Sequence, residues 1–298
     1  MKKKLFLLIA ATLCLYTAAS AQSDTTAWGT ILRRETPRQR ESLRILVIGN
    51  SFTVDAVNQN LCELLDEAGI DATIGNLYIG GCTLQRHWKT IADTSERQKH
   101  VYYEITSGGV SKTKGACIED ALRKGPWDWV VFQQGGGQNG FYNTHFPWMD
   151  YLKGYIQAFL PAGSYKTAFQ QSWAYHRSST RTHFEQYGYD QDRMFAMLVE
   201  AGEKLTANVD VVIPTCTAIQ NGRYTHLGDN FHRDNTSHLE LSYGRYTAAC
   251  TLFEALTGID VRGFAFHPGS LSADLARLCQ ECAHEAVANP YTVTIVEK

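Results

Sequence analysis

The sequence predicts an α/β protein: a three-layer α/β/α sandwich of the flavodoxin-like kind, with a central parallel sheet. Apolar or β-branched runs alternate along the chain with stretches of helical period, which is typical of a parallel sheet covered by helices on both faces. The runs at 44–48 and 127–133 lack polar alternation, which indicates strands buried on both faces. Functional residues are therefore expected at the carboxyl ends of these two strands.

Expected strands and helices alternate along most of the chain. Strands are expected at 44–48, 72–79, 101–106, 127–133, 166–172 and 210–214, with an edge strand at 291–296. Helices are expected at 54–68, 84–95, 118–124, 148–159, 191–206, 239–256 and 271–288. The sequence contains no internal repeat, so one domain at 41–298 is predicted.

Residues 1–21 have the pattern of a secretory signal peptide. Three lysines precede a short apolar run, and small residues end the segment near Ala21. The run is too short for a membrane span, and no second long apolar run follows it. We expect a secreted or periplasmic protein without a membrane span, cleaved near Ala21, in which the polar segment 22–40 is a lead-in to the domain.

Charge and cysteine content exclude several classes of function. The chain has 28 Lys and Arg against 30 Asp and Glu, with three of the lysines in the leader and no basic block elsewhere, so nucleic acid and anionic membranes are not expected partners. Seven cysteines follow the leader, an odd number that leaves at least one thiol unpaired. Cys279 and Cys282 form a lone CxxC pair, for which burial or an incidental disulfide is favoured over a metal or redox site. No metal is expected.

Ser51 is the first candidate for a catalytic residue. It follows the buried run LRILVIGN by a tight turn and precedes a helical stretch, where unpaired backbone N–H groups can stabilise an oxyanion. The structural alternative is that Ser51 or Thr53 only caps the helix.

Two further segments could supply donors to the same site. Gly81 lies in a Gly-Gly pair after the strand at 72–79, where its N–H could point at a bound oxygen, although an ordinary glycine turn has the same appearance. Gln133 and Gln134 end the strand at 127–133, and only one of the two amides can face a pocket because neighbours on a strand point in opposite directions. The glycines that follow lack the spacing and the lysine of a phosphate-binding loop.

A histidine near the end of the domain could serve as the base. His238 precedes a helical stretch and has Asp234 four residues before it, as needed for an imidazole held in one tautomer by a carboxylate. His232 is a competing base in the same loop, and a histidine with no catalytic role is the structural alternative for either residue.

Taken together, these segments resemble the four conserved blocks of the SGNH (GDSL-type) hydrolases, and more narrowly the DUF4886 branch of that superfamily. The resemblance covers about Leu43 to Gly258 and rests on the segments GNSFT, IGGCTLQRHW, VVFQQ, QQSWAY, VIPTCTAIQNGR and HLELSYGRYTAAC.

The resemblance implies ester hydrolysis without metal or organic cofactor. It implies Ser51 as nucleophile, His238 as general base and then acid, and Gly81 as oxyanion donor. A glutamine replaces the family's asparagine, for which Gln134 is preferred over Gln133. The acid stands one residue further from the histidine than in the usual DxxH, so either Asp234 orients His238 or a Ser-His dyad remains.

The sequence thus predicts an exported serine esterase that removes acyl groups, most simply O-acetyl groups, from carbohydrate. Aromatic side chains in the predicted loops suit sugar rings: Tyr142, His145, Trp148, Trp173, Tyr175 and His176. The alternatives are a non-catalytic carbohydrate-binding protein on the same scaffold and a lipid or thioester hydrolase.

Overall fold

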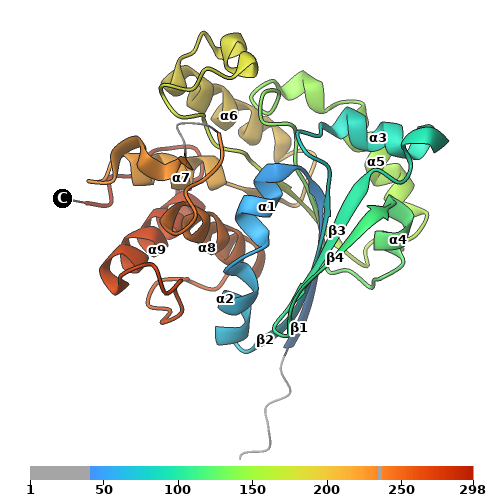
Figure 1. The fold of residues 1–298 in the computed structure, drawn as a ribbon, viewed down its shortest axis with the longest axis horizontal. Coiled ribbons are helices and arrows are strands. Elements are labelled where there is room, and N and C mark those ends of the chain that lie inside the picture. The colour runs from blue at the N-terminus through green and yellow to red at the C-terminus, as the bar shows by residue number, and fades with distance from the viewer. Residues whose placement is uncertain (1–40, 234–236, 298) are drawn as a thin grey trace, which may run out of the picture. The chain divides into compact units, whose positions relative to one another are not determined.

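A central sheet of seven strands organises the part of the chain that the computed structural model describes, residues 41–233 and 237–297 (Figure 1). The predicted signal peptide and lead-in lie outside these residues. The strand order is β4-β3-β2-β1-β5-β6-β7. The strands are β1 (Glu41–Gly49), β2 (Ile70–Tyr78), β3 (His100–Thr106), β4 (Gly109–Ala116), β5 (Trp129–Phe132), β6 (Lys166–Gln170) and β7 (Val211–Ile213).

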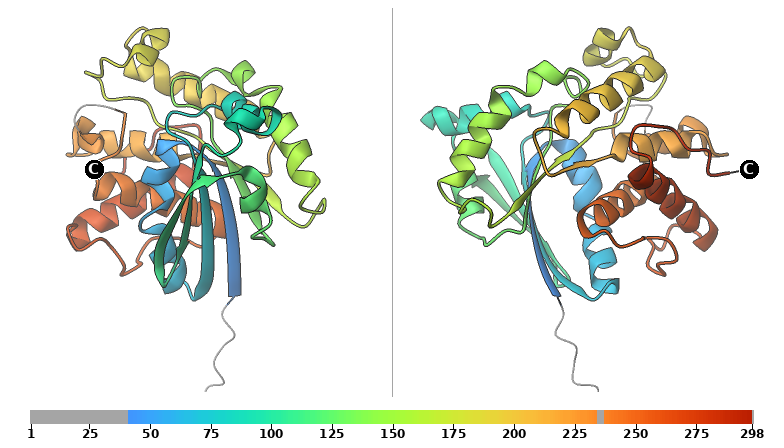
Figure 2. Two further views of the ribbon diagram at one scale, coloured as in Figure 1. Left: turned by 45° about the vertical axis from the view of Figure 1, so that its right-hand side comes forward. Right: turned by 180° about the vertical axis from the view of Figure 1, so that it is seen from behind.

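Helices cover both faces of the sheet, which confirms the three-layer α/β/α class (Figures 1 and 2). The helices are α1 (Ser51–Val57), α2 (Leu61–Glu67), α3 (Leu84–Ala92), α4 (Ile118–Leu122), α5 (Trp148–Gln157), α6 (Gln191–Leu205), α7 (Thr215–Arg223), α8 (Tyr243–Thr257) and α9 (Ala273–Ala288). Short 3₁₀ turns lie at Thr94–Glu96, Tyr142–His145, Thr182–Tyr187 and Gly228–Phe231.

The central strand β1 joins two apolar cores through the alternation of its side chains. Ile45 and Val47 pack into the core formed with α1, α2, α8 and α9, whereas Leu46 and Ile48 pack into the core formed with α3, α4 and α5. All four side chains are fully buried, as predicted for a strand covered on both faces.

The sheet is mostly parallel, as predicted, but the two pairings of β3 are antiparallel. Parallel pairing joins the five strands β2, β1, β5, β6 and β7 in that order. Strand β3 pairs antiparallel with β2 and with β4. The turn between β3 and β4 ends at Gly109, whose φ of +120° suits only glycine. β4 was not predicted because its residues up to Gly115 are exposed and show no apolar alternation.

Other boundaries also differ from the prediction. The expected helix at 54–68 is two helices, separated near Asn60, which has a φ of +69°. Helix α7 was not predicted, and 291–296 forms no strand with the described residues. All seven cysteines after the leader are buried free thiols, including Cys279 and Cys282.

None of the helices in the described part of the chain is both long enough and apolar enough to span a bilayer.

Candidate active site

The turn after β1 holds Ser51 at the carboxyl end of the central strand. Gly49 is required there, since a Cβ atom at this position would lie 2.3 Å from Thr53 Cγ2. Asn50 is the N-cap of α1, because its side chain accepts a hydrogen bond of 3.0 Å from the N–H of Phe52. Ser51 is the first residue of the helix and is partly exposed. Neither Ser51 nor Thr53 is therefore the cap.

Asn50 also ties this turn to the two neighbouring loops. Its Nδ2 atom donates hydrogen bonds to the carbonyl oxygens of Cys82, at 3.0 Å, and Gln134, at 3.1 Å. Asn50 is buried, so both bonds are shielded from water. Loops that follow β1, β2 and β5 are thereby fixed at one point beside Ser51.

His238 is held by a carboxylate on the helix that begins at Ser51. Its Nδ1 atom lies 2.8 Å from Oδ2 of Asp55, although the two residues are 183 positions apart in the chain. Asp55 is 1% exposed and also accepts hydrogen bonds from the N–H of Leu239 and from Arg245, whose Nη2 is 2.7 Å from Oδ1. A carboxylate with this set of donors stays in place and fixes the plane of the imidazole.

Ser51 and Asp55 lie four positions apart in α1, so their side chains share one face of the helix. The imidazole of His238 packs beside the same turn, with its centre 5.6 Å from that of the Phe52 ring. Ser237 lines the same pocket as Ser51. Because Nδ1 faces Asp55, proton exchange with a hydroxyl falls to Nε2.

The predicted acid, Asp234, lies outside the described residues, as does Asn235. The carboxylate bonded to His238 in the described part of the chain belongs to Asp55, which the sequence analysis did not select. A signal for it existed, because a helix beginning near Ser51 places residue 55 on the same face as residue 51.

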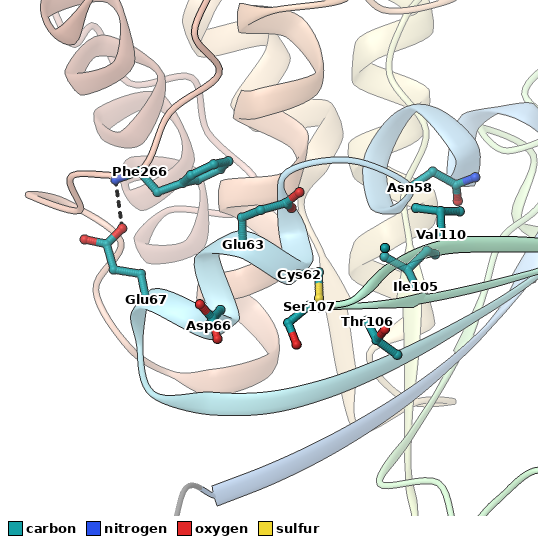
Figure 3. Close-up of a pocket in the computed structure, with 11 residues that line it drawn as sticks. Asn58, Cys62, Glu63, Asp66, Glu67, Ile105, Thr106, Ser107, Val110 and Phe266 are labelled. Atoms are coloured by element: carbon teal, nitrogen blue, oxygen red, sulfur yellow. Dashed lines mark hydrogen bonds between the residues drawn. The ribbon is translucent and has the colours of Figure 1, made fainter.

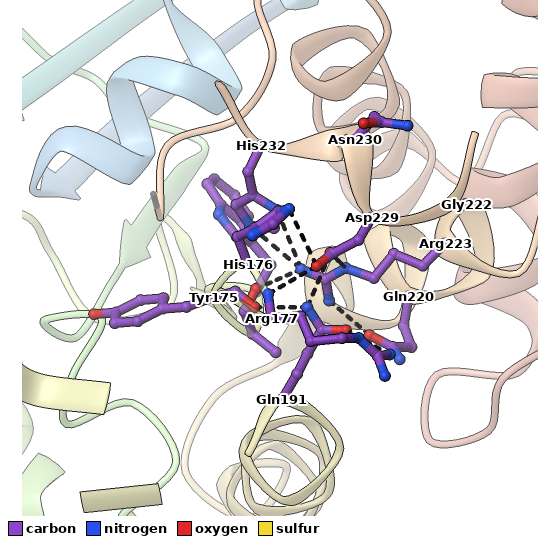
Figure 4. Close-up of polar contacts among 12 residues, drawn as sticks. Tyr175, His176, Arg177, Gln191, Gln220, Gly222, Arg223, Asp229, Asn230 and His232 are labelled. Atoms are coloured by element: carbon purple, nitrogen blue, oxygen red, sulfur yellow. Dashed lines mark hydrogen bonds and ion pairs between the residues drawn. The ribbon is translucent and has the colours of Figure 1, made fainter. Parts of the chain in front are cut away.

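His232, the competing base, lies in a different environment. It is buried with Nδ1 and Nε2 each 3.3 Å from Nη2 of Arg223, in the polar network drawn in Figure 4. Burial, together with the positive charge of Arg223, holds the pKa of His232 well below its usual range. His232 therefore remains neutral, and its role is to pack within this buried polar network.

A small pocket of about 150 Å³ opens at Ser51. Gly81 lies on its wall with a φ of +62°, a conformation that favours glycine. Among the described residues, the backbone N–H groups of Ser51 and Gly81 have no hydrogen-bond partner. The lining residues are Asn50, Ser51, Phe52, Gly81, Thr83, Gly135, Gly136, Gly137, Gln138, Tyr175, Arg181, His183 and Ser237.

One of Gln133 and Gln134 was predicted to face the substrate, with Gln134 preferred, but both are fully buried and neither lines this pocket. Gln134 Oε1 accepts from the N–H groups of Leu84 and Gly135, and its Nε2 donates to the carbonyl oxygen of Thr144 at 2.9 Å. Gln133 Oε1 accepts from the N–H of Asn50 at 3.4 Å, while its Nε2 is buried without a partner in the described part of the chain. Their amides support the loops around the pocket.

The three glycines after Gln134 form part of the pocket wall. Larger residues would not fit at two of these positions. A Cβ atom on Gly136 would lie 2.2 Å from the ring of Phe52, and one on Gly137 would lie 2.4 Å from Cβ of His183. The loop thus passes directly against the residue next to Ser51. Gln138, the next residue, also lines this pocket.

A larger pocket of about 450 Å³ lies elsewhere, between α2 and the β3–β4 turn (Figure 3). It is lined by Glu63, Asp66 and Glu67 together with Val110 and Phe266, among others. None of the predicted catalytic residues contributes to it. Ser51 lies in the smaller pocket, which is therefore the candidate active site.

The fold and the site define a class: a three-layer α/β/α protein with a serine and a carboxylate-bound histidine at the carboxyl edge of its sheet. Within that class, the chain belongs to the family described as "Domain of unknown function (DUF4886)", whose model matches residues 44–286. The family predicted from the sequence motifs is thus confirmed. A comparison with curated proteins found no match.

One solved structure of the same family is similar to this chain over most of its length, and other solved structures resemble it more distantly. The chain is similar to the crystal structure of a DUF4886 family protein from Bacteroides uniformis, with 35% identity, a TM-score of 0.81, and coverage of 86% of this chain and 98% of that one. A putative SGNH hydrolase from Slackia heliotrinireducens matches with 17% identity and a TM-score of 0.49, over 72% of this chain and all of that one. Axe2, an acetylxylan esterase from Geobacillus stearothermophilus, matches with 12% identity and a TM-score of 0.42, over 77% and 99% of the two chains.

Proposed function

We propose that the protein is an exported serine esterase that hydrolyses short acyl esters, most simply O-acetyl esters of carbohydrate. The observation that carries this proposal is the contact of His238 with Asp55 on the helix that begins at Ser51. A histidine oriented by a buried carboxylate beside an accessible serine is the arrangement that activates a hydroxyl for attack.

The reaction proceeds in two acyl transfers. His238 Nε2 takes the proton of the Ser51 hydroxyl as its oxygen attacks the ester carbonyl, and the same proton is given to the departing alcohol oxygen. Water then attacks the acyl-serine carbonyl and loses a proton to His238. The bond between the acyl carbon and Ser51 Oγ breaks as His238 returns that proton to Oγ, and the carboxylic acid leaves. Asp55 stabilises the imidazolium formed in each step, and Arg245 holds Asp55 in place.

The negative charge of each tetrahedral intermediate falls on the former carbonyl oxygen. The unpaired N–H groups of Ser51 and Gly81 are the donors for that oxygen. Two lining residues, Asn50 and Gln138, carry side-chain amides, and the Nδ2 atom of Asn50 already donates to two backbone carbonyls. We therefore assign to Gln138 the third-donor role first assigned to Gln133 or Gln134.

The pocket favours a short acyl group. Its volume of about 150 Å³ is below the roughly 300–1,000 Å³ typical of sites that enclose a whole ligand, so it suits an acetyl group with the rest of the substrate outside. Among the predicted sugar-binding aromatics, Tyr175 lines the pocket, whereas Trp173 and His145 are fully buried. Carbohydrate recognition would therefore rest on Tyr175 and the polar residues around it.

The test compares Ser51→Ala with Ser237→Ala, a serine that lines the same pocket. Ser51→Ala should abolish release of p-nitrophenol from its acetate ester and prevent labelling by an alkyl fluorophosphonate, which reacts with activated serines. Ser237→Ala should still be labelled. Undiminished labelling of Ser51→Ala would remove Ser51 as the nucleophile.

Two outcomes would favour the alternatives. A folded wild-type protein that is not labelled and hydrolyses no ester would be a binding protein on this scaffold. A rise of kcat/KM as the acyl chain of p-nitrophenyl esters grows from two to twelve carbons would indicate a lipid or thioester hydrolase instead.

A further inference from the structure

Basic but no acidic side chains line the active-site pocket. Arg181 and His183 line it, and none of its lining residues is acidic. Within the described residues Arg181 forms no ion pair, and Asp55, the nearby carboxylate, is bonded to His238 and Arg245 outside this lining. An exposed guanidinium without a protein carboxylate is available to a ligand.

Tyr175 brings a second donor to the same wall. The residue is 3% exposed, yet its hydroxyl has no hydrogen-bond partner in the described part of the chain. The hydroxyl lies over the glycine loop, since a Cβ on Gly136 would be 3.0 Å from it. Burial raises the pKa of Tyr175 to about 12 and the charge of Arg181 opposes this rise, so the phenol stays protonated with the guanidinium nearby.

The backbone around Tyr175 is fixed from behind. Its carbonyl accepts a hydrogen bond of 2.7 Å from Gln191 Nε2, and the carbonyl of Ala174 accepts one of 2.6 Å from Arg223. Asp229 joins these donors by accepting from Gln191 and Arg223, both at 2.9 Å. Figure 4 shows the Tyr175 ring pointing away from this network. The phenol is therefore a preorganised part of the pocket wall.

We propose that Arg181 and Tyr175 bind an anionic group of the substrate, so that the ester removed is carried by an acidic sugar. A guanidinium presents paired donors that match the oxygens of a carboxylate or a sulfate, and the phenol adds one more donor to the same group. The inference rests on the proposed esterase function and specifies its substrate class.

The first experiment measures selectivity in the wild-type protein. Acetylated methyl glucuronoside is compared with acetylated methyl glucoside and with the glucoside 6-sulfate, which separates a carboxylate from a sulfate as the recognised group. We expect kcat/KM to be about 10- to 100-fold higher for one of the two anionic sugars than for the neutral one, through KM. Equal values for all three sugars would overturn the inference.

The second experiment tests the residues. Arg181→Gln should bring the ratio of acidic to neutral kcat/KM close to one, Arg181→Lys should keep part of it, and Tyr175→Phe should lower it several-fold. The control is Arg277→Gln, an exposed arginine of α9 paired with Asp274, which should leave the ratio unchanged. Unchanged selectivity in Arg181→Gln would also overturn the inference.

Failure of this inference differs from failure of the esterase proposal. Loss of the selectivity ratio in a protein that is labelled at Ser51 and hydrolyses p-nitrophenyl acetate would overturn only the anion site. Absence of labelling and of all ester hydrolysis would overturn the proposed function on which the inference rests.

Discussion

Replacement of Asp55 by asparagine tests the part of the site that the sequence analysis did not identify. The substitution keeps the size of the side chain but removes its charge and one acceptor. Asp55 accepts from His238 Nδ1 at 2.8 Å and from Arg245 at 2.7 Å. An asparagine can accept with one atom only, so one of these donors would face an N–H group and the imidazole would be driven to the wrong tautomer.

The expected loss follows from these contacts. In serine proteases the equivalent change lowers kcat by about 10⁴, and a fall of 10³ to 10⁴ corresponds to roughly 4–5.5 kcal/mol of transition-state stabilisation. Arg245 would lose the negative charge of its buried partner, so we also expect about 1–3 kcal/mol less stability. The assay is kcat for p-nitrophenyl acetate, with thermal unfolding to show that the variant is folded.

Asp234→Asn is the matched control, because Asp234 is the acid predicted from the sequence. We expect this variant to stay within a few-fold of the wild type. Combining Asp55→Asn with His238→Ala should cost no more than His238→Ala alone, since the two residues act as one unit. If Asp234→Asn lost a thousand-fold while Asp55→Asn stayed active, the assignment of Asp55 would be refuted.

Three further predictions concern the pocket wall and the buried histidines. Gly136→Ala should lower stability by about 1–3 kcal/mol and reduce kcat/KM, because the new Cβ would lie 2.2 Å from the Phe52 ring; calorimetry and the esterase assay measure both effects. His100 and His145 have pKa values lowered by burial to about 4, so the unfolded chain binds more protons below pH 6.5. Urea unfolding should therefore show stability falling from pH 6.5 toward 4, by up to about 3 kcal/mol for each residue, and a flat profile would contradict this. Gln134→Ala should cost about 2–3 kcal/mol in urea unfolding but change kcat less than ten-fold, since its amide supports loops rather than substrate; a larger loss of kcat would restore it as an oxyanion donor.

The parts of the fold that follow from apolar periodicity were predictable. β1 and β5 are buried on both faces and stand out as continuous apolar runs, and α6 and α9 lie close to their expected bounds. β4 could not be found this way because its stability comes from backbone pairing with β3, while its side chains face water. The direction of β3 against β2 is likewise invisible in apolar periodicity, so the two antiparallel pairings were not predicted.

The residues of the site were predictable to different degrees. Ser51 and Gly81 could be selected because backbone geometry marks them locally, by a strand end and by a glycine pair. The partner of His238 was harder to find: the spacing of Asp55 from Ser51 was a signal, but nothing local links Asp55 to a histidine 183 positions away. The two glutamines looked like substrate ligands because strand ends normally face the pocket, but hydrogen bonds to neighbouring loops hold Gln134 inward.

Placement of Ser51 and Asp55 one turn apart on α1 affects how activity is acquired during folding. Both residues are positioned as soon as this short helix forms, so completion of the site depends on one long-range contact, that of His238 with Asp55. Contacts over such long chain separations form slowly relative to local structure. Recovery of the proposed esterase activity after refolding should therefore lag behind recovery of helical circular dichroism, and its rate would report the docking of the carboxyl-terminal third of the chain.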